Sequence, residues 1–123
     1  MMTADLPRDR EALASAYREF NARKLEDVLA RLHPNVEWAN GMEGGHVFGR
    51  EGVRAYWTRQ WAILDPHVEP LEIEEDEDGR LVIKVHQVVR DLKGTVLVDT
   101  IVHHAYRFAN GLIQRMDILA HGN

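Results

Sequence analysis

The sequence contains no cysteine, and this absence excludes several kinds of chemistry at once. Disulfide bonds, thiolate nucleophiles and thiolate metal ligands all require the missing sulfur atom. A chain without cysteine suits a reducing compartment, and we expect a cytoplasmic protein. The first residues are polar and charged, without the apolar stretch of a secretory signal. No apolar run reaches membrane-spanning length, so we expect no membrane partner.

An excess of basic residues is also lacking. The chain has 15 lysines and arginines against 20 aspartates and glutamates, a net charge of −5. We therefore expect no nucleic-acid partner, because phosphate binding needs a basic surface. The seven histidines are scattered and form no HExxH motif, which predicts no metal site. Neither a phosphate-binding loop nor a serine nucleophile elbow is present, and we expect no cofactor.

The residues that are present predict one compact domain. A chain of 123 residues with 45% hydrophobic residues can bury a sizeable core. We assign residues 1–123 to a single domain and expect residues 1–7 to form a flexible N-terminus.

Helical spacing of apolar residues predicts three helices in the first half of the chain. The first begins near Pro7 and Asp9, and a second runs from Leu25 until Pro34 stops it. A third ends at Asp65-Pro66. The apolar residues that define the first and third helices are Leu13, Ala16, Tyr17 and Phe20, then Val53, Tyr56, Trp57, Trp61 and Leu64. Gln60 is the one polar residue on the apolar face of the third helix.

Strands dominate the second half. One short strand is predicted over residues 36–39, an extended segment begins at Leu71, and further strands cover 81–90, 96–108 and 112–119. Asn110-Gly111 is the strongest hairpin signal, since both residues tolerate a positive φ. The order α-α-β-α-β-β-β-β predicts an α+β fold with helices on one face of an antiparallel sheet.

The segment over residues 36–57 combines five glycines with Trp38, Met42 and Trp57. Glycines let a backbone turn tightly and approach another group closely, while the three large side chains offer apolar walls. Such a loop between regular elements is typical of the border of a small-molecule pocket.

The chain resembles the NTF2-like superfamily, and within it the SnoaL-like and ketosteroid-isomerase-like proteins. The resemblance covers roughly residues 8–119 and lies in a few segments. These are Tyr17 with Phe20, Asn21-Ala22, the HPNVEW segment, the helix entry at residues 49–53, and residues 106–113. It implies a strongly curved sheet around the helices, a cone-shaped pocket between them, and a homodimer formed through the outer face of the sheet.

The resemblance makes Asp117 a candidate acid/base residue. SnoaL-like cyclases tend to have a His-Trp-Asp pattern in the last strand, and Arg115 and Met116 replace the first two residues here. A carboxylate beside apolar walls can acquire a raised pKa and transfer a proton near neutral pH. The neighbouring arginine favours the other interpretation, an ion-paired aspartate. Strand alternation does not decide which face Asp117 occupies, because both faces of this strand are half apolar and a bulge would shift the register.

Trp38 stands where ketosteroid isomerases have their proton-shuttling aspartate, after the Val-Glu pair of the first strand. The base of that reaction is therefore missing, and classical ketosteroid isomerase activity is not expected. Trp38 is a candidate pocket wall, with plain core packing as the equal alternative.

Alternation along the strand over residues 96–108 separates two faces. The more apolar face carries His104 with Thr100 and Tyr106, so we place these residues toward the helices and the cavity. Gln87 shares that face on the preceding strand. His104 is thus the second acid/base candidate, although a buried, hydrogen-bonded histidine is the commoner outcome. Helix faces add Tyr17, Tyr56 and Gln60 to the predicted lining.

The opposite sheet face mixes charged and apolar side chains, and we predict that it forms the homodimer interface, with a solvated surface as the alternative. Its residues are Val82, Lys84, His86, Val88, Arg90, Leu97, Asp99, Ile101, His103 and Arg107.

Three functions remain open. The first is a cofactor-independent acid/base enzyme of cyclase, isomerase or hydrolase type, in which Asp117 and His104 exchange protons with a hydrophobic, oxygenated substrate. The second is a binding module with the same pocket. The third is a dimeric scaffold whose cavity is residual core. An enzyme needs a titratable group inside the cavity, and a binding module needs only the cavity.

Overall fold

The computed structural model describes residues 7–119, which form three helices and one six-stranded sheet. Pro7 begins the first helix, so the rest of the segment predicted to be flexible, residues 1–6, lies outside the described residues. The elements in chain order are α1 (Pro7–Asn21), α2 (Leu25–Leu29), β1 (Leu32–Ala39), β2 (His46–Phe48), α3 (Gly49–Ile63), β3 (Leu64–Glu75), β4 (Leu81–Asp91), β5 (Val96–Ala109) and β6 (Leu112–Leu119).

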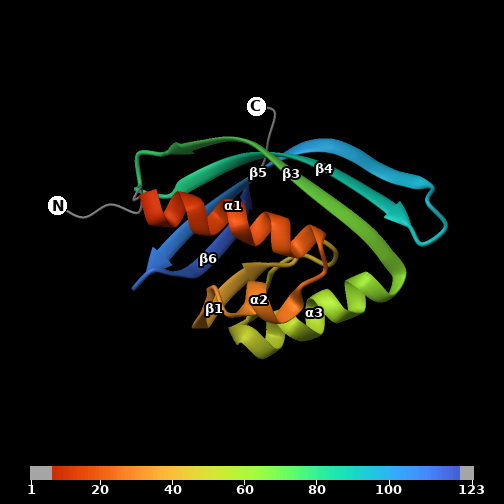
Figure 1. Ribbon diagram of the computed structural model, residues 1–123, viewed down its shortest axis with the longest axis horizontal. Coiled ribbons are helices and arrows are strands. Elements are labelled where there is room, and N and C mark those ends of the chain that lie inside the picture. The colour runs from red at the N-terminus through yellow and green to blue at the C-terminus, as the bar shows by residue number, and fades with distance from the viewer. Residues whose placement is uncertain (1–6, 120–123) are drawn as a thin grey trace.

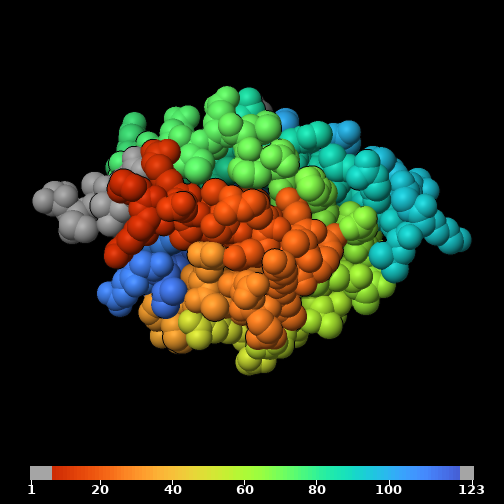
Figure 2. Space-filling view, in the orientation of Figure 1, coloured from red at the N-terminus to blue at the C-terminus, as the bar shows by residue number. Residues whose placement is uncertain are grey.

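The sheet has the strand order β2-β1-β6-β5-β4-β3. All neighbouring pairs are antiparallel except β1 and β6, which run parallel. The sheet curves around the helices, and α1 crosses its hollow side (Figure 1). Figure 2 shows α1 and α2 covering the middle of this face, while the end of the β4–β5 hairpin projects beyond the helices. The α+β architecture predicted from the sequence is confirmed.

The core fills the space between the helices and the hollow side of the sheet. Leu13 of α1, Val53 of α3 and Ile83 of β4 are fully buried within one apolar cluster. Two hydrogen bonds join the end of α1 to β3. The side-chain oxygen of Asn21 accepts one from the backbone N–H of Val68, and the side-chain nitrogen of Asn21 donates one to the carbonyl oxygen of Val68. The first and third helices therefore have their apolar stripes against the sheet, as their spacing predicts.

The second helix is shorter than predicted, and the first strand is longer. α2 ends at Leu29, and β1 begins at Leu32 and runs through Pro34. Leu32 pairs with Ile113 of β6, and the register then shifts before Glu37. Pro34 lacks the N–H that a regular ladder needs, and it lies within this irregularity. The proline thus interrupts strand pairing instead of ending a helix.

The glycine-rich segment contains a strand that the sequence analysis missed. β2 turns back on β1 and pairs His46 with Ala39. The side-chain oxygen of Asn40 accepts hydrogen bonds from the backbone N–H groups of Met42 and Glu43, and it shapes the connecting turn. β2 adds an element to the predicted order.

The third strand also begins earlier than predicted, at Leu64 directly after α3. It contains Pro66 and Pro70, and prolines argue against a strand when the sequence is read alone. β3 lies at the edge of the sheet, where a proline costs no ladder hydrogen bond on the solvent side. The predicted hairpin at Asn110-Gly111 is confirmed, with φ values of 55° and 81°.

Candidate small-molecule site

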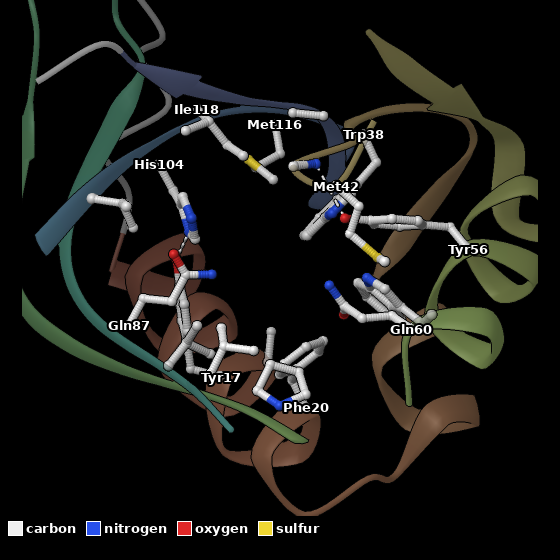
Figure 3. Close-up of a pocket in the computed structure, with 18 of the residues that line it drawn as sticks. Tyr17, Phe20, Trp38, Met42, Tyr56, Gln60, Gln87, His104, Met116 and Ile118 are labelled. Atoms are coloured by element: carbon white, nitrogen blue, oxygen red, sulfur yellow. Dashed lines mark hydrogen bonds between the residues drawn. The ribbon is translucent and has the colours of Figure 1, made fainter. Parts of the chain in front are cut away.

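A cavity of about 420 Å³ lies between α1, α3 and the hollow side of the sheet. This volume falls in the range of pockets that hold drug-sized molecules. Figure 3 shows side chains from both helices and from the strands converging on it. The cavity is lined mostly by apolar and aromatic side chains, with a few polar groups between them.

Most of the predicted lining residues reach this cavity. His104 lies on it, as do eight of the nine predicted binding residues: Tyr17, Trp38, Met42, Tyr56, Trp57, Gln60, Gln87 and Tyr106. Thr100 does not line the cavity. It pairs across the strands with Gln87, whose longer side chain supplies the polar group at this level of the sheet.

Several lining residues were not singled out from the sequence. Val98 and Val102 share the strand face of His104, and Phe20 shares the helix face of Tyr17. The same alternation and helical spacing that identified their neighbours could have identified them. Met116 and Ile113 line the cavity too, although their positions in β6 have opposite parity. The register of β5 and β6 shifts next to Phe108, and this bulge brings both side chains to one face.

Aromatic residues form one wall of the cavity. Trp38 of β1 meets Trp57 of α3 edge-on, with ring centroids 5.2 Å apart. Phe20 of α1 contacts the same Trp57 ring at 5.3 Å. Edge-to-face contacts at these distances are favourable and hold the rings in fixed orientations. Trp38 is therefore both pocket wall and core packing, the two roles that its sequence position left open.

A buried hydrogen-bonded network adjoins this aromatic wall, where Tyr106 meets Trp38 with ring centroids 6.1 Å apart. The Tyr17 hydroxyl of α1 lies 2.8 Å from Nδ1 of His104 and 2.9 Å from the Tyr106 hydroxyl, both on β5. Tyr17 and His104 point toward one another across the cavity wall in Figure 3. We call these three residues the polar triad. The Nε2 atom of His104 has no hydrogen-bond partner among residues 7–119.

Burial keeps the polar triad uncharged. It lowers the pKa of His104 to about 4, with a smaller contribution from the adjacent His103. Burial also raises the pKa of Tyr17 and of Tyr106 above the ordinary value for tyrosine. At neutral pH the imidazole and both phenols are therefore neutral, and they act as hydrogen-bond donors and acceptors.

Two glutamines and a third tyrosine supply further polar groups. The Tyr56 hydroxyl accepts a hydrogen bond from the backbone N–H of Gly41 at 3.1 Å. The amides of Gln60 and Gln87 line the cavity, and neither has a hydrogen-bond partner within the described part of the chain. Gln60 lies on the Tyr56 side of the cavity and Gln87 beside the polar triad (Figure 3). Unpaired amides on an apolar cavity are available to a bound molecule.

Asp117 is not brought to this cavity. Its neighbours Met116 and Ile118 line the pocket, and its own carboxylate lies on the other side of β6. There it accepts a hydrogen bond from Nε of Arg115 at 2.8 Å and lies 2.9 Å from Nε2 of His46. These contacts, the one with Arg115 first, lower the pKa of Asp117. The structure thus separates Asp117 from His104 and contains the arginine ion pair that the sequence favoured.

The described helices include none long and apolar enough to cross a membrane. Over residues 7–119, histidine and acidic side chains form no group of three that could hold a metal ion. The absence of a cofactor stays a prediction.

The curved sheet, the helices on its hollow side and the pocket between them define an α+β protein of the NTF2-like class. The chain belongs to the SnoaL-like domain family, whose model matches residues 13–116.

Solved structures of the same fold support this assignment. TerC, which was co-crystallised with polyporic acid, is 28% identical, with 91% of this chain and 90% of that chain covered and a TM-score of 0.78. An NTF2-like protein of unknown function from Burkholderia pseudomallei is 25% identical over 93% and 91% of the two chains, with a TM-score of 0.80. A putative polyketide cyclase from Pseudomonas putida has the same fold at 18% identity, with 98% and 93% covered and a TM-score of 0.78. No curated protein matches this chain.

The lowered pKa of Asp117 predicts a pH-dependent contribution to stability. The ionised carboxylate stabilises the folded state above its unfolded pKa of about 3.9, and this contribution disappears as the pH falls through the lower folded pKa. We expect Asp117→Asn to reduce the free energy of unfolding by about 1 kcal/mol at pH 7. The difference from the parent protein should vanish in acid. Urea unfolding followed by tryptophan fluorescence measures both values.

The control is Asp65→Asn, which removes the carboxylate of a more exposed pair with Arg23. This variant should unfold close to the parent midpoint at every pH. Equal stability of Asp117→Asn and the parent at pH 7 would contradict the role given to the ion pair.

Proposed function

We propose that this protein binds a small, mainly apolar molecule that carries oxygen atoms. The observation that carries the proposal is the polar triad in the wall of a mainly apolar cavity. Three buried polar side chains in a pocket of about 420 Å³ fix the orientation of a ligand, while the aromatic wall supplies contact area. The co-crystallisation of TerC with polyporic acid supports this class of ligand, since TerC is 28% identical to this chain.

A fluorescent naphthyl ketone, 2-methoxy-6-propionylnaphthalene, is a suitable probe because it is apolar and carries two oxygen atoms. We expect saturable binding with a change in its emission. Val102→Phe should weaken binding at least about tenfold, because the added ring occupies the cavity. Tyr17→Phe should weaken it by roughly 2- to 10-fold, because it removes both hydrogen bonds that hold His104 and Tyr106 in place.

The matched control is Val82→Phe, the same substitution on the outer face of β4. It should leave the dissociation constant unchanged. Equal binding by the parent and Val102→Phe, or no binding by the parent, would overturn the proposal.

Acid/base catalysis of cyclase, isomerase or hydrolase type is a second proposal, favoured by one observation. The Nε2 atom of His104 is unpaired among the described residues, and its side chain lines the cavity. A neutral imidazole nitrogen can accept a proton from the carbon next to a bound carbonyl group. Asp117 is not part of this proposal, because its carboxylate lies on the other side of β6.

Proton exchange tests this activity without knowledge of the substrate. In D₂O, the parent protein should speed the replacement of the two protons next to the ketone of the probe, as measured by NMR. His104→Gln should reduce exchange to the rate in buffer while it still binds the probe. His103→Gln, on the other sheet face, should exchange at the parent rate. Exchange by His104→Gln at the parent rate would exclude His104 as the base.

We also propose that the protein forms a homodimer through the outer face of the sheet. This face exposes apolar Leu97, 54% exposed, near the ion pair of His86 and Asp99. Burying such a mixed face is typical of subunit interfaces.

Light scattering during gel filtration should give the mass of a dimer for the parent and of a monomer for Leu97→Glu. Ile63→Glu, at a similarly exposed position at the end of α3, should remain dimeric. A monomeric parent protein would contradict the interface.

A further inference from the structure

Among residues 7–119, no lysine, arginine, aspartate or glutamate lines the cavity. Its titratable residues come from two helices and one strand: Tyr17 of α1, Tyr56 of α3, and His104 and Tyr106 of β5. A charged ligand placed among them therefore finds no opposite charge. Removing an ion from water costs several kcal/mol unless a partner of opposite charge or several hydrogen bonds replace its hydration.

The ionisable residues outside the lining that affect the pKa values of these groups are few. Glu43 raises the pKa of Tyr56, and Arg59 lowers it. The side chains of Glu43 and Arg59 lie 3.4 Å from each other and are more than half exposed. His103, the neighbour of His104, belongs to the opposite strand face by alternation. None of these groups offers a buried counter-charge to a molecule inside the pocket.

The polar triad has few hydrogen-bond donors that are free for a ligand. A neutral imidazole and two phenols carry three exchangeable protons in total. The hydrogen bonds of Tyr17 with His104 and with Tyr106 use two of them. One donor is left in either arrangement. If Nδ1 of His104 accepts from the Tyr17 hydroxyl, the free donor is Nε2–H of His104. If Nδ1–H donates to the Tyr17 hydroxyl, the free donor is the O–H of one of the two tyrosines.

This count limits what the polar triad can stabilise. A single donor satisfies a carbonyl or ether oxygen, and in the second arrangement Nε2 accepts from a hydroxyl group. The amide of Gln87 likewise donates or accepts as a neutral dipole. An oxyanion has more lone pairs to satisfy and loses a stronger hydration shell, so these neutral groups replace its hydration only in part.

We infer that the pocket selects the uncharged form of an oxygenated ligand, such as a ketone, ether, alcohol or un-ionised phenol, and discriminates against the corresponding anion. This inference rests on the proposed binding function and specifies its ligand class. The low pKa of His104 and the raised pKa values of the tyrosines agree with it, because the lining itself does not change charge near neutral pH.

A pair of probes that differ only in their ability to ionise tests this selectivity. 6-Propionyl-2-naphthol loses its phenolic proton in mildly alkaline solution, whereas its methyl ether, 2-methoxy-6-propionylnaphthalene, cannot. We expect the dissociation constant of the naphthol to be constant below its own pKa and to rise about tenfold per pH unit above it. The dissociation constant of the ether should stay constant over the same range.

Two variants at one position provide the control. Gln87→Arg places a permanent cation on the cavity and should bind the naphtholate at least about tenfold more tightly than the parent does. Gln87→Met removes the same amide without adding a charge, so we expect it to bind both probes more weakly than the parent does and to keep the rise of about tenfold per pH unit above the pKa of the naphthol. Equal or tighter binding of the naphtholate by the parent, with normal binding of the ether, would overturn this inference alone. Failure of the ether to bind would instead overturn the proposed binding function.

Discussion

The hydrogen bonds of the Tyr17 hydroxyl are the interaction on which the pocket depends. They join α1 to β5 through two residues that are far away in the sequence, and they do so at the cavity wall. A buried phenol or imidazole without a partner would cost more than its hydrogen bond contributes. The pairing therefore fixes how α1 lies across the sheet, and it leaves an ordered polar group facing an apolar space.

The curved sheet separates two kinds of chemistry. On its hollow side, burial holds titratable groups in their neutral forms, as the pKa of about 4 for His104 shows. On the other side, Arg115 and His46 keep Asp117 ionised in a partly exposed ion pair. On β6, Asp117 thus lies among charged groups, whereas its immediate neighbours Met116 and Ile118 face the cavity. This separation explains why a proton-transferring pair of Asp117 and His104 does not form, and why the lining contributed by residues 7–119 is uncharged.

Strong local patterns predicted much of the pocket. Helical spacing identified Tyr17, Tyr56 and Gln60, and alternation along two regular strands identified His104 and Gln87. Prediction failed where the pattern was weak or interrupted. β6 is half apolar on both faces, and the bulge beside Phe108 brings Ile113 and Met116 to the same side. β2 is only three residues long. Prolines within β1 and β3 weaken the strand prediction for these segments, although their positions in the sheet tolerate proline.

The sequence by itself determined the class of fold, the family resemblance and the residues that line most of the pocket, because these follow from periodicities and turns within short segments. Only the tertiary structure decided that Tyr17, His104 and Tyr106 share hydrogen bonds and that Asp117 pairs with Arg115 outside the cavity. It also decided that, within the described part of the chain, no ionised residue faces the cavity. Those facts depend on strand register and on contacts between distant segments. The pattern of a single strand does not encode them, since one bulge reverses the face of every residue that follows.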